Sequence, residues 1–342
     1  MTNYLFYLIT FQIIVTIIFV KISIKFNLVD FPNNRKTHDA PTPYTGGIVI
    51  ATTFLFMIFI TNFNIKFLNL LLSYSFLIAL SGYIDDRYKV NPGTKIILQI
   101  LPIILLINNE LYLVDLGDYY YFGKIILGSF DKVFTLLCCL FIINASNYCD
   151  GIDSLLSIIT SIILIVFAII LYNLKILEHA NYLILISITL IVHSIFNFGV
   201  IKGYKVFLGD SGSNLLGFIV SFITINLYLT ENIHPALLIW PLSYLVFEFL
   251  SVNLIRIINK EALFKAGNDH FHYLLKKKFK INNYFVIFII STITILTSLI
   301  GYFINQKLPP DYSLLIFIFL FIIYFLLRYK FCYSIKNKSN YH

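Results

Sequence analysis

Carboxylate and amide side chains stand at the ends of long apolar runs in three parts of this sequence. They are the pair Asp85–Asp86, the segment Asn144–Asp153 and Asp210. A carboxylate at or just inside the face of a lipid bilayer costs a few kcal/mol unless it is hydrated, paired or bound to a metal. We therefore expect these residues to serve a function, and we expect the three sites to converge on one face.

The second of these sites is the densest. Asn147, Asp150 and Asp153 follow one another at steps of three, so a helix that continues through them would place them on one face, within about 5–6 Å of each other. Gly151, between the carboxylates, lets a ligand or another backbone approach closely. A chance grouping of this kind inside an apolar chain is the weaker interpretation.

Asp85 and Asp86 are adjacent, and adjacent carboxylates repel each other, so one tends to take up a proton unless a cation is nearby. Such a pair suits a divalent metal or a proton acceptor. The other interpretation is a solvated turn, because Asp and Arg are common in turns and Arg87 follows the pair.

Asp210 lies in the run Gly209–Asn214, which opens another apolar stretch. An Asp and two serines at a helix start are typical of an N-terminal cap. They are also the hard oxygen ligands that Mg²⁺ requires. Phe207, three residues earlier, is available to stack on a planar base.

Two basic segments carry further candidates. Arg35, Lys36 and His38 precede Gly46-Gly47 at an expected helix start, where backbone amides and positive charge would bind an anion. An ordinary basic loop beside the membrane is the alternative.

His270 and His272 lie among seven basic residues of the segment 256–280. Neither a cysteine nor a further histidine of this segment completes a zinc site. We therefore expect these histidines to stabilise phosphate.

The composition predicts a polytopic membrane protein, because 59% of the residues are hydrophobic and 12% are charged, about half the charge of a soluble protein. Apolar runs of about 20 residues predict one all-α integral membrane domain over residues 1–342, a bundle of eleven helices. We expect them near residues 3–24, 46–62, 67–84, 94–108, 132–148, 154–173, 180–197, 213–230, 234–257, 282–304 and 311–329.

The basic residues predict the orientation. Twenty of the 25 Lys and Arg residues fall on one side of the eleven-span arrangement, which the positive-inside rule makes cytoplasmic. The N-terminus is then outside, the C-terminus is inside, and the acidic sites form a cytoplasmic active-site face. The outer loop 111–130 is expected to hold a short extracellular β-hairpin. The net charge of +8 reflects topology and anionic lipid, not a nucleic-acid partner.

Taken in order, these segments resemble the polyprenyl-phosphate N-acetylhexosamine-1-phosphate transferase superfamily, which includes the phospho-MurNAc-pentapeptide translocase. The resemblance spans residues 28 to about 275. Its motifs are Asp30-Phe-Pro-Asn with Arg35-Lys36-Thr-His38 and Gly46-Gly47, Asp85-Asp86, Asn144-Ala-Ser-Asn147 with Asp150-Gly-Ile-Asp153, Phe207-Leu-Gly-Asp210-Ser-Gly-Ser213, and His270-Phe-His272.

The resemblance implies a role for each matching residue. It makes Asp210 and Asn147 the ligands of Mg²⁺, with Mn²⁺ as the alternative ion. From the resemblance and the residue pattern together, we expect catalytic roles for Asp85, Asp86, Asp150, His270 and His272. We expect substrate binding by Arg35, Lys36, His38, Lys95, Asn144, Asp153, Asn197 and Phe207, and the resemblance implies that Phe207 stacks on uracil. One departure is Ser154, where relatives usually have Gly, and another is the longer loop 199–204.

The resemblance also implies a reaction. N-acetylhexosamine 1-phosphate, most simply of the GlcNAc type, would pass from a UDP-sugar to undecaprenyl phosphate in the bacterial cytoplasmic membrane, releasing UMP. This step would initiate a cell-surface polysaccharide, either O-antigen, capsule or teichoic acid. Direct attack by the lipid phosphate and an aspartyl-phosphate intermediate both stay open, as does a homodimer.

Two other functions are weighed against this one. A phospho-MurNAc-pentapeptide translocase activity is the alternative within the superfamily. An ion-coupled transporter or lipid flippase is the alternative from another class, and it would carry its charges in mid-span. Glu248 is the one carboxylate away from the ends of a predicted span, and a structural hydrogen bond between helices is as good an interpretation of it as an active-site role.

Overall fold

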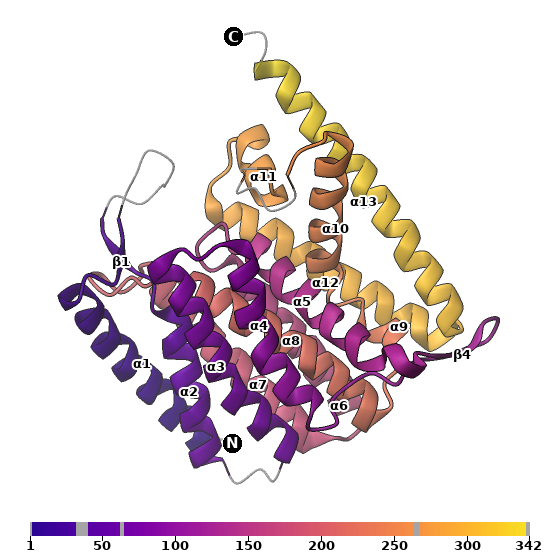
Figure 1. Ribbon diagram of the computed structural model, residues 1–342, viewed down its shortest axis with the longest axis horizontal. Coiled ribbons are helices and arrows are strands. Elements are labelled where there is room, and N and C mark those ends of the chain that lie inside the picture. Colours follow the sequence, from indigo (N-terminus) through magenta and orange to yellow (C-terminus); the bar gives the residue numbers. More distant parts are fainter. Residues whose placement is uncertain (1, 32–39, 62–64, 263–266, 268, 340–342) are drawn as a thin grey trace. The chain divides into compact units, whose positions relative to one another are not determined.

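The computed structural model describes residues 2–31, 40–61, 65–262, 267 and 269–339, and most of them are helical (Figure 1). The chain forms two compact units. The first unit comprises Met1–Tyr112 and Leu136–Ile223, and the second unit comprises Leu113–Thr135 and Thr224–His342. The all-α class is confirmed, and the single domain over residues 1–342 stays a prediction.

Antiparallel and neighbouring helices build the first unit. Helix α6 packs on α7, α3 packs on α2 and α4, and α1 and α2 contact each other and α7. Before α2, Val29 of β1 pairs with Pro43 of β2. The elements are α1 (Thr2–Lys25), β1 (Val29–Asp30), β2 (Thr42–Pro43), α2 (Gly46–Ile60), α3 (Lys66–Tyr88), α4 (Pro92–Ile107), α5 (Asp131–Cys149, shared with the second unit), α6 (Leu155–Asn173), α7 (Leu177–Asn197) and α8 (Gly209–Glu231, also shared).

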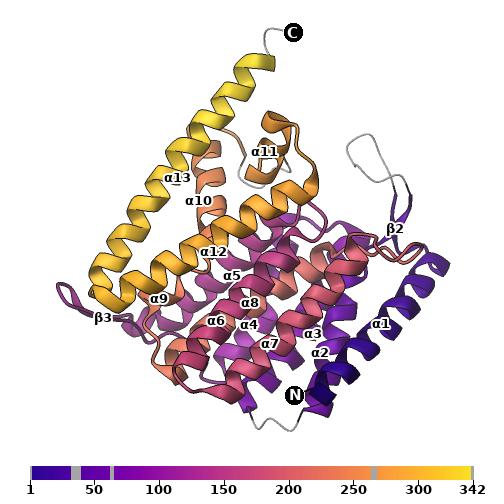
Figure 2. The same cartoon turned by 180° about the vertical axis from the view of Figure 1, so that it is seen from behind.

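The second unit is organised around α10, α12 and α13, which contact one another. Helices α12 and α13 diverge from the turn that joins them (Figure 2). Strands β3 and β4 pair antiparallel, with Tyr119 opposite Gly123, inside the segment expected to hold a hairpin. The elements are β3 (Asp115–Tyr119), β4 (Gly123–Ile126), a 3₁₀ turn (Gly128–Phe130), α9 (Pro235–Leu238), α10 (Ser243–Ile258), α11 (Phe271–Phe279), α12 (Asn283–Lys307) and α13 (Pro310–Ser339).

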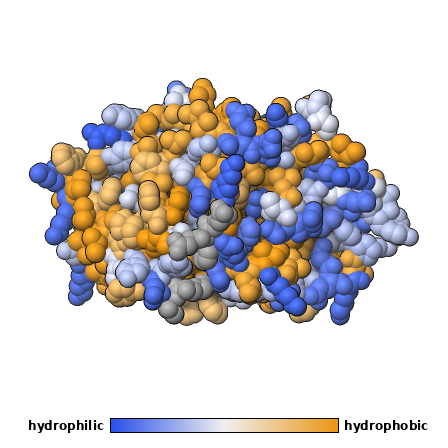
Figure 3. All heavy atoms as spheres, turned by 90° about the horizontal axis from the view of Figure 1, so that it is seen from below, coloured by the Kyte–Doolittle hydropathy of each residue, from blue (hydrophilic) through white to orange (hydrophobic). Residues whose placement is uncertain are grey.

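Within the described residues, eight helices are long and apolar enough to cross a membrane, and α2 and α4 are shorter apolar helices. Large apolar side chains remain exposed along them, with Phe59 85% and Phe288 68% exposed. Figure 3 shows broad hydrophobic areas on the face seen from below. A soluble protein rarely exposes so much apolar surface, so the chain is a multi-pass membrane protein. The total of eleven spans stays a prediction.

The ninth predicted span, 234–257, is wrong as a single helix. It is divided into α9 and α10 by a turn at residues 239–242. Pro241 lacks an N–H and disfavours the helical conformation of the residue before it. That residue, Trp240, is fully buried and donates its indole N–H to Ser313 Oγ at 2.9 Å.

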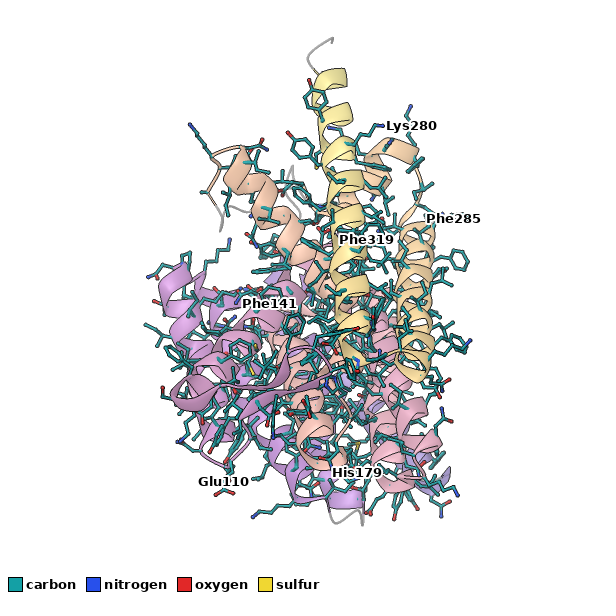
Figure 4. All side chains as sticks on the ribbon, turned by 90° about the vertical axis from the view of Figure 1, so that its right-hand side faces the viewer. Glu110, Phe141, His179, Lys280, Phe285 and Phe319 are labelled. Atoms are coloured by element: carbon teal, nitrogen blue, oxygen red, sulfur yellow. The ribbon has the colours of Figure 1, made fainter. Side chains whose placement is uncertain are left out.

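The direction of the helices places many polar residues at one end of the first unit. In Figure 4, Glu110, just after α4, and His179, in the first turn of α7, lie at the same end of this unit. The opposite end therefore carries the start of α4 and the end of α7. The ends of α3 and α5 and the starts of α6 and α8 are joined to these by the contacts described next.

Candidate active site

Four carboxylates of the first unit meet at the end of this unit that carries the start of α4 and the end of α7. Asp85 and Asp86 lie near the end of α3, Asp150 follows α5 directly, and Asp210 is in the first turn of α8. Burial first, and then the negative charges of Asp210 and Asp86, raise the pKa of Asp150 well above its ordinary value. The structure thus brings together three acidic sites that lie between residues 85 and 210 of the sequence.

Lys95 lies between two of these carboxylates. Its Nζ is 2.9 Å from Asp85 Oδ2 and 3.1 Å from Asp210 Oδ1. It stands in the first turn of α4, and the Asn91 side chain caps that helix by accepting the Thr94 N–H at 2.9 Å. Among the described residues, the ion pairs of this cluster involve Lys95 as their single cation.

Asp86 caps the N-terminus of α8 from a neighbouring helix. Its Oδ1 accepts the Asp210 N–H at 2.9 Å and its Oδ2 accepts the Ser211 N–H at 3.1 Å. A carboxylate is favourable there because the first N–H groups of a helix lack partners within it. Gly82 permits this contact, since a Cβ on it would lie 2.4 Å from the Asp210 carbonyl oxygen.

A chain of amides runs beside the carboxylates. Asn214 Oδ1 accepts from Gln99 Nε2 at 2.9 Å and from Asn147 Nδ2 at 3.0 Å. Asn147 Oδ1 accepts from Ser213 Oγ, and Asn144 Nδ2 lies 3.5 Å from Gln99 Oε1. Asn144 and Asn147 therefore share one network.

Asn214 was part of the run expected around Asp210, but neither Gln99 nor Asn214 was predicted to have a role in the site. The signal was there, because Gln99 is four residues after Lys95 and Asn214 is four residues after Asp210. Residues at that spacing share a helix face. Both side chains are also buried, which requires a partner for each amide.

The expected helical face through Asp153 is not formed, because α5 ends at Cys149 and a turn follows. Asp153 pairs instead with Lys205, whose Nζ lies 2.7 Å from Asp153 Oδ2. The same Nζ is 5.1 Å from the ring centroid of Phe207. Lys205 was not predicted, and it joins a carboxylate to the half-buried aromatic ring expected to stack on a base.

The Asn197 side chain links the end of α7 by hydrogen bonds to the start of α6 and to the segment before α8. Its Oδ1 accepts from Ser154 N and from Ser154 Oγ, the latter at 3.1 Å, and its Nδ2 donates to the Val206 carbonyl at 2.8 Å. The side chain is 3% exposed. The predicted contact of Asn197 with substrate stays a prediction, and the hydrogen bonds give it a positioning role.

Ser154 occupies a left-handed conformation, with φ of +65°. Glycine adopts this region without strain, which accounts for the glycine expected here from the resemblance. The single proton of the serine hydroxyl is shared between Asn197 Oδ1 and the Ser194 carbonyl, which lies 3.0 Å from Oγ.

The expectation that Gly46 and Gly47 offer their amides to an anion is wrong. Gly46 N donates to the Phe207 carbonyl at 3.0 Å, and Gly47 N donates to the Leu208 carbonyl at 3.1 Å. These bonds attach the start of α2 to the segment that leads into α8. Arg35, Lys36 and His38 lie outside the described residues.

The histidine motif belongs to the second unit. The rings of His270 and His272 are nearly parallel, with centroids 5.6 Å apart and an angle of 9° between planes. Burial first, and then the charge of His270, lower the pKa of His272 to about 3. An imidazole with this pKa is neutral at pH 7, so His272 does not contribute positive charge.

The oxygen donors of the first unit suit a hard divalent cation, since carboxylate and amide oxygens are the ligands that Mg²⁺ prefers. Among the described residues, however, no three His, Cys, Asp or Glu side chains form a ready metal cage. Asp86 accepts backbone N–H groups of α8, and Asp85 and Asp210 both pair with Lys95. The donor chemistry therefore fits such a cation, although these carboxylates are engaged with Lys95 and with backbone N–H groups.

Apolar helices that gather four carboxylates, a lysine and a chain of amides at one end define a multi-pass membrane protein with a polar site among its helix ends. The profile of "Glycosyl transferase family 4" matches residues 67–228, a range that contains all four carboxylates. The chain belongs to this family.

Similar proteins come from several bacteria. The chain is 30% identical over 283 residues to an undecaprenyl-phosphate alpha-N-acetylglucosaminyl 1-phosphate transferase of Yersinia pestis, covering 81% of this chain and 77% of that protein. A protein of the same name from Escherichia coli K12 is 28% identical, covering 75% and 71%. A probable undecaprenyl-phosphate N-acetylglucosaminyl 1-phosphate transferase of Bacillus subtilis is 27% identical, covering 77% and 74%.

Proposed function

We propose that this protein transfers N-acetylglucosamine 1-phosphate from UDP-N-acetylglucosamine to undecaprenyl phosphate, releasing UMP and forming undecaprenyl-diphosphate-N-acetylglucosamine. The observation that carries this proposal is the meeting of Asp85, Asp86, Asp150 and Asp210 at one end of the first unit, where Lys95 pairs with Asp85 and Asp210. The names of the relatives supply the acceptor and the sugar. The nucleotide part of the donor is our own inference.

The charged residues of the site would have different roles. Lys95 would attract the diphosphate, and its pairing with the carboxylates holds its ammonium group in position. Asp210 and Asn147 would hold Mg²⁺, or Mn²⁺ in its place, and such an ion neutralises charge that develops on a departing phosphate. Phe207 would stack on the base, beside the Lys205–Asp153 pair.

The lipid phosphate does not need a strong base to deprotonate it before it attacks. The second pKa of a phosphate monoester is about 6, so undecaprenyl phosphate is mostly dianionic at neutral pH. We favour direct attack by the lipid phosphate on the phosphate that carries the sugar. UMP released from UDP-sugar without any lipid acceptor would instead support an aspartyl-phosphate intermediate.

We further propose a place and an orientation. The protein would lie in the bacterial cytoplasmic membrane with its N-terminus outside and its C-terminus and acidic site in the cytoplasm, because 20 of 25 basic residues favour that side. Reporter tags after Tyr119 and after Asn340 should report outside and inside respectively. Both tags on one side would contradict the orientation.

We also propose that the product starts a surface polysaccharide and that the protein assembles as a homodimer.

Membranes that contain the protein would be given radiolabelled UDP-N-acetylglucosamine, UDP-N-acetylgalactosamine and UDP-MurNAc-pentapeptide in separate reactions with undecaprenyl phosphate and Mg²⁺. Lipid-extractable label is expected from the first donor, with UMP formed in equal amount. Label from the pentapeptide donor alone would favour the translocase activity. Transport of an ion or lipid without any labelled product would favour a transporter function over an enzyme function.

A further inference from the structure

Glu248 is a carboxylate buried in the second unit, with 0% of its side chain exposed. It lies on α10, whose neighbours in that unit are α12 and α13. A buried charge is costly unless it is both paired and hydrogen-bonded. The partners of the Glu248 carboxylate therefore indicate the role of this buried charge.

Two side chains of α13 hold the Glu248 carboxylate from one side. Arg328 Nε is 3.2 Å from Oε2 and its Nη2 donates to Oε1 at 3.3 Å. Tyr324 donates its hydroxyl to Oε2 at 2.8 Å. Tyr324 and Arg328 are four residues apart, so they project from one face of the helix. The pair is fully enclosed, since Arg328 is 1% exposed.

The other partners of this ion pair belong to the histidine motif. Glu248 Oε1 accepts the Phe271 backbone N–H at 2.9 Å and lies 3.6 Å from His270 Nδ1. Arg328 Nη2 also donates to the Asp269 carbonyl at 2.6 Å. The backbone on both sides of His270 is thus attached to the two members of one buried ion pair.

A second arginine fixes the residue that precedes the motif. Arg256, on α10 two turns after Glu248, donates its Nε to Asp269 Oδ2 at 3.0 Å and its Nη2 to Asp269 Oδ1 at 2.9 Å. Such a two-pronged pair sets orientation as well as distance. Helices α10 and α13 therefore determine where the first histidine of the motif stands.

A simple structural link between helices would not need these contacts. A buried ion pair is a poor way to gain stability, because apolar side chains of similar volume are often as stabilising or more so. The feature that apolar side chains would not reproduce is the set of hydrogen bonds to Asp269 and Phe271.

We propose that Glu248, together with Arg328, is a positioning residue that orients His270 for the transfer reaction. The inference rests on the proposed function and on the expectation from the sequence that the histidine motif stabilises phosphate. A carboxylate facing Nδ1 directs that side of the imidazole toward α10 and leaves Nε2 on the other side of the ring. The C-terminal helix α13 thereby becomes part of the reaction machinery.

The test replaces the ion pair without leaving a buried charge. The double variant Glu248→Met, Arg328→Met keeps similar volume and is expected to insert and fold. Glu248→Gln keeps an oxygen for the Phe271 N–H and is expected to retain more activity than the double variant. The matched control is Ser313→Ala, which removes a buried hydroxyl of α13 that bonds Trp240 and has no bond to the histidine motif.

Three measurements are made on each purified variant: thermal unfolding, hydrogen exchange by mass spectrometry, and kcat and KM for UDP-sugar. In the double variant, the peptide that covers residues 269–273 should exchange at least ten times faster while α12 keeps its protection. The kcat should fall ten- to a hundred-fold, with KM changed less than threefold. Ser313→Ala should lower the unfolding temperature but leave kcat and the 269–273 exchange unchanged.

Other outcomes overturn the positioning role. A folded double variant with normal kcat, or with normal exchange at residues 269–273, would show that the ion pair does not orient the motif. Loss of protection throughout α10, α12 and α13 would assign the pair to stability alone. If the wild-type protein makes no lipid-linked sugar, the proposed function fails, and the exchange data still decide whether the pair holds the loop.

Discussion

The Asp86 carboxylate accepts the backbone N–H of Asp210 at 2.9 Å, although 124 residues separate the two in the chain. Asp86 therefore holds the main chain at the start of α8, while the Asp210 side chain is left to face Lys95 at 3.1 Å. The two aspartates therefore have different roles in one cluster. Because the Asp210 side chain does not hold the start of α8, its carboxylate can be replaced without disturbing that part of the fold.

The variant Asp210→Asn should insert normally and lose at least 99% of its turnover. The backbone bond to Asp86 does not involve the substituted atoms, so only the negative charge is removed. Higher Mg²⁺ should restore part of the activity if metal affinity is what was lost. Turnover is measured by the lipid-linked product across a Mg²⁺ titration, with protein amount normalised by in-gel detection. Near-normal activity at low Mg²⁺ would exclude Asp210 as a main metal ligand.

Lys95→Met removes the cation between Asp85 and Asp210 and should lower the free energy of unfolding by about 2 kcal/mol. This is less than the 3–5 kcal/mol of a fully buried pair, since Lys95 is partly exposed to screening solvent. Mg²⁺ should then stabilise the variant more than the wild-type protein, because two carboxylates lack a counterion. Thermal unfolding with Mg²⁺ and with chelator measures this difference, and Lys95→Arg serves as the control that keeps the charge. An equal Mg²⁺ effect on all three proteins would argue against a shared cation site.

Asp150 should make stability depend on pH. The pKa of its carboxyl is raised in the folded protein, so the folded state holds a proton that the unfolded state releases near pH 4. Stability linked to this group is therefore greatest below pH 4 and is lost as pH rises through the raised pKa. Asp150→Asn should thus be more stable than the wild-type protein at pH 8, with the gain disappearing at pH 4. Unfolding temperatures in chelator across this range test the sign, and a gain that does not change with pH would contradict it.

The sequence predicted the positions of the helices well because an apolar run of about 20 residues has few alternatives in a lipid environment. It also predicted that Asp85–Asp86, Asp150 and Asp210 converge, since each follows or opens an apolar run on the same predicted side. The break at Pro241 had a visible signal in the proline itself, but the surrounding apolar residues hid it.

Partners that are far apart in the chain could not be predicted. Arg328 lies 80 residues after Glu248, and periodicity within one helix gives no information about a helix so distant in sequence. The amides of Gly46 and Gly47 were expected to be free for an anion because their acceptors, the Phe207 and Leu208 carbonyls, belong to another segment. The same limit applies to Asp153, whose partner Lys205 became visible only when the end of α5 was known.

Ser154 allows a test of backbone strain beside the site. A non-glycine residue in the left-handed region costs about 1–2 kcal/mol, and the hydroxyl bond to Ser194 returns about 1 kcal/mol. Ser154→Gly relieves the strain and loses the bond, so its free energy of unfolding should stay within about 1 kcal/mol of the wild-type value. Ser154→Ala keeps the strain and loses the bond, so it should be less stable by about 1 kcal/mol. Denaturation curves of the two variants compare them directly, and an alanine variant as stable as the glycine variant would argue against strain at this position.

Substitution of Phe207 would distinguish the proposed recognition of the nucleotide from catalysis. Its ring is half-buried and lies under the Lys205 ammonium at 5.1 Å, three residues before Asp210. Stacking of a base on an aromatic ring contributes about 1–3 kcal/mol, which corresponds to roughly a ten- to hundred-fold change in affinity. Phe207→Ala should therefore raise the KM for UDP-sugar by that factor while kcat falls less.

Two companion variants show whether the ring acts by stacking or by packing. Phe207→Trp keeps an aromatic face and should restore much of the affinity, whereas Phe207→Leu keeps apolar volume and should not. The backbone bond from Phe207 N to the Pro43 carbonyl, 2.7 Å long, is present in every variant, so the start of α8 should remain attached to the β1–β2 pair. KM, kcat and unfolding temperature are measured together. A leucine variant with normal KM, or an alanine variant that is unstable but binds UDP-sugar normally, would identify Phe207 as a packing residue and remove it from the nucleotide site.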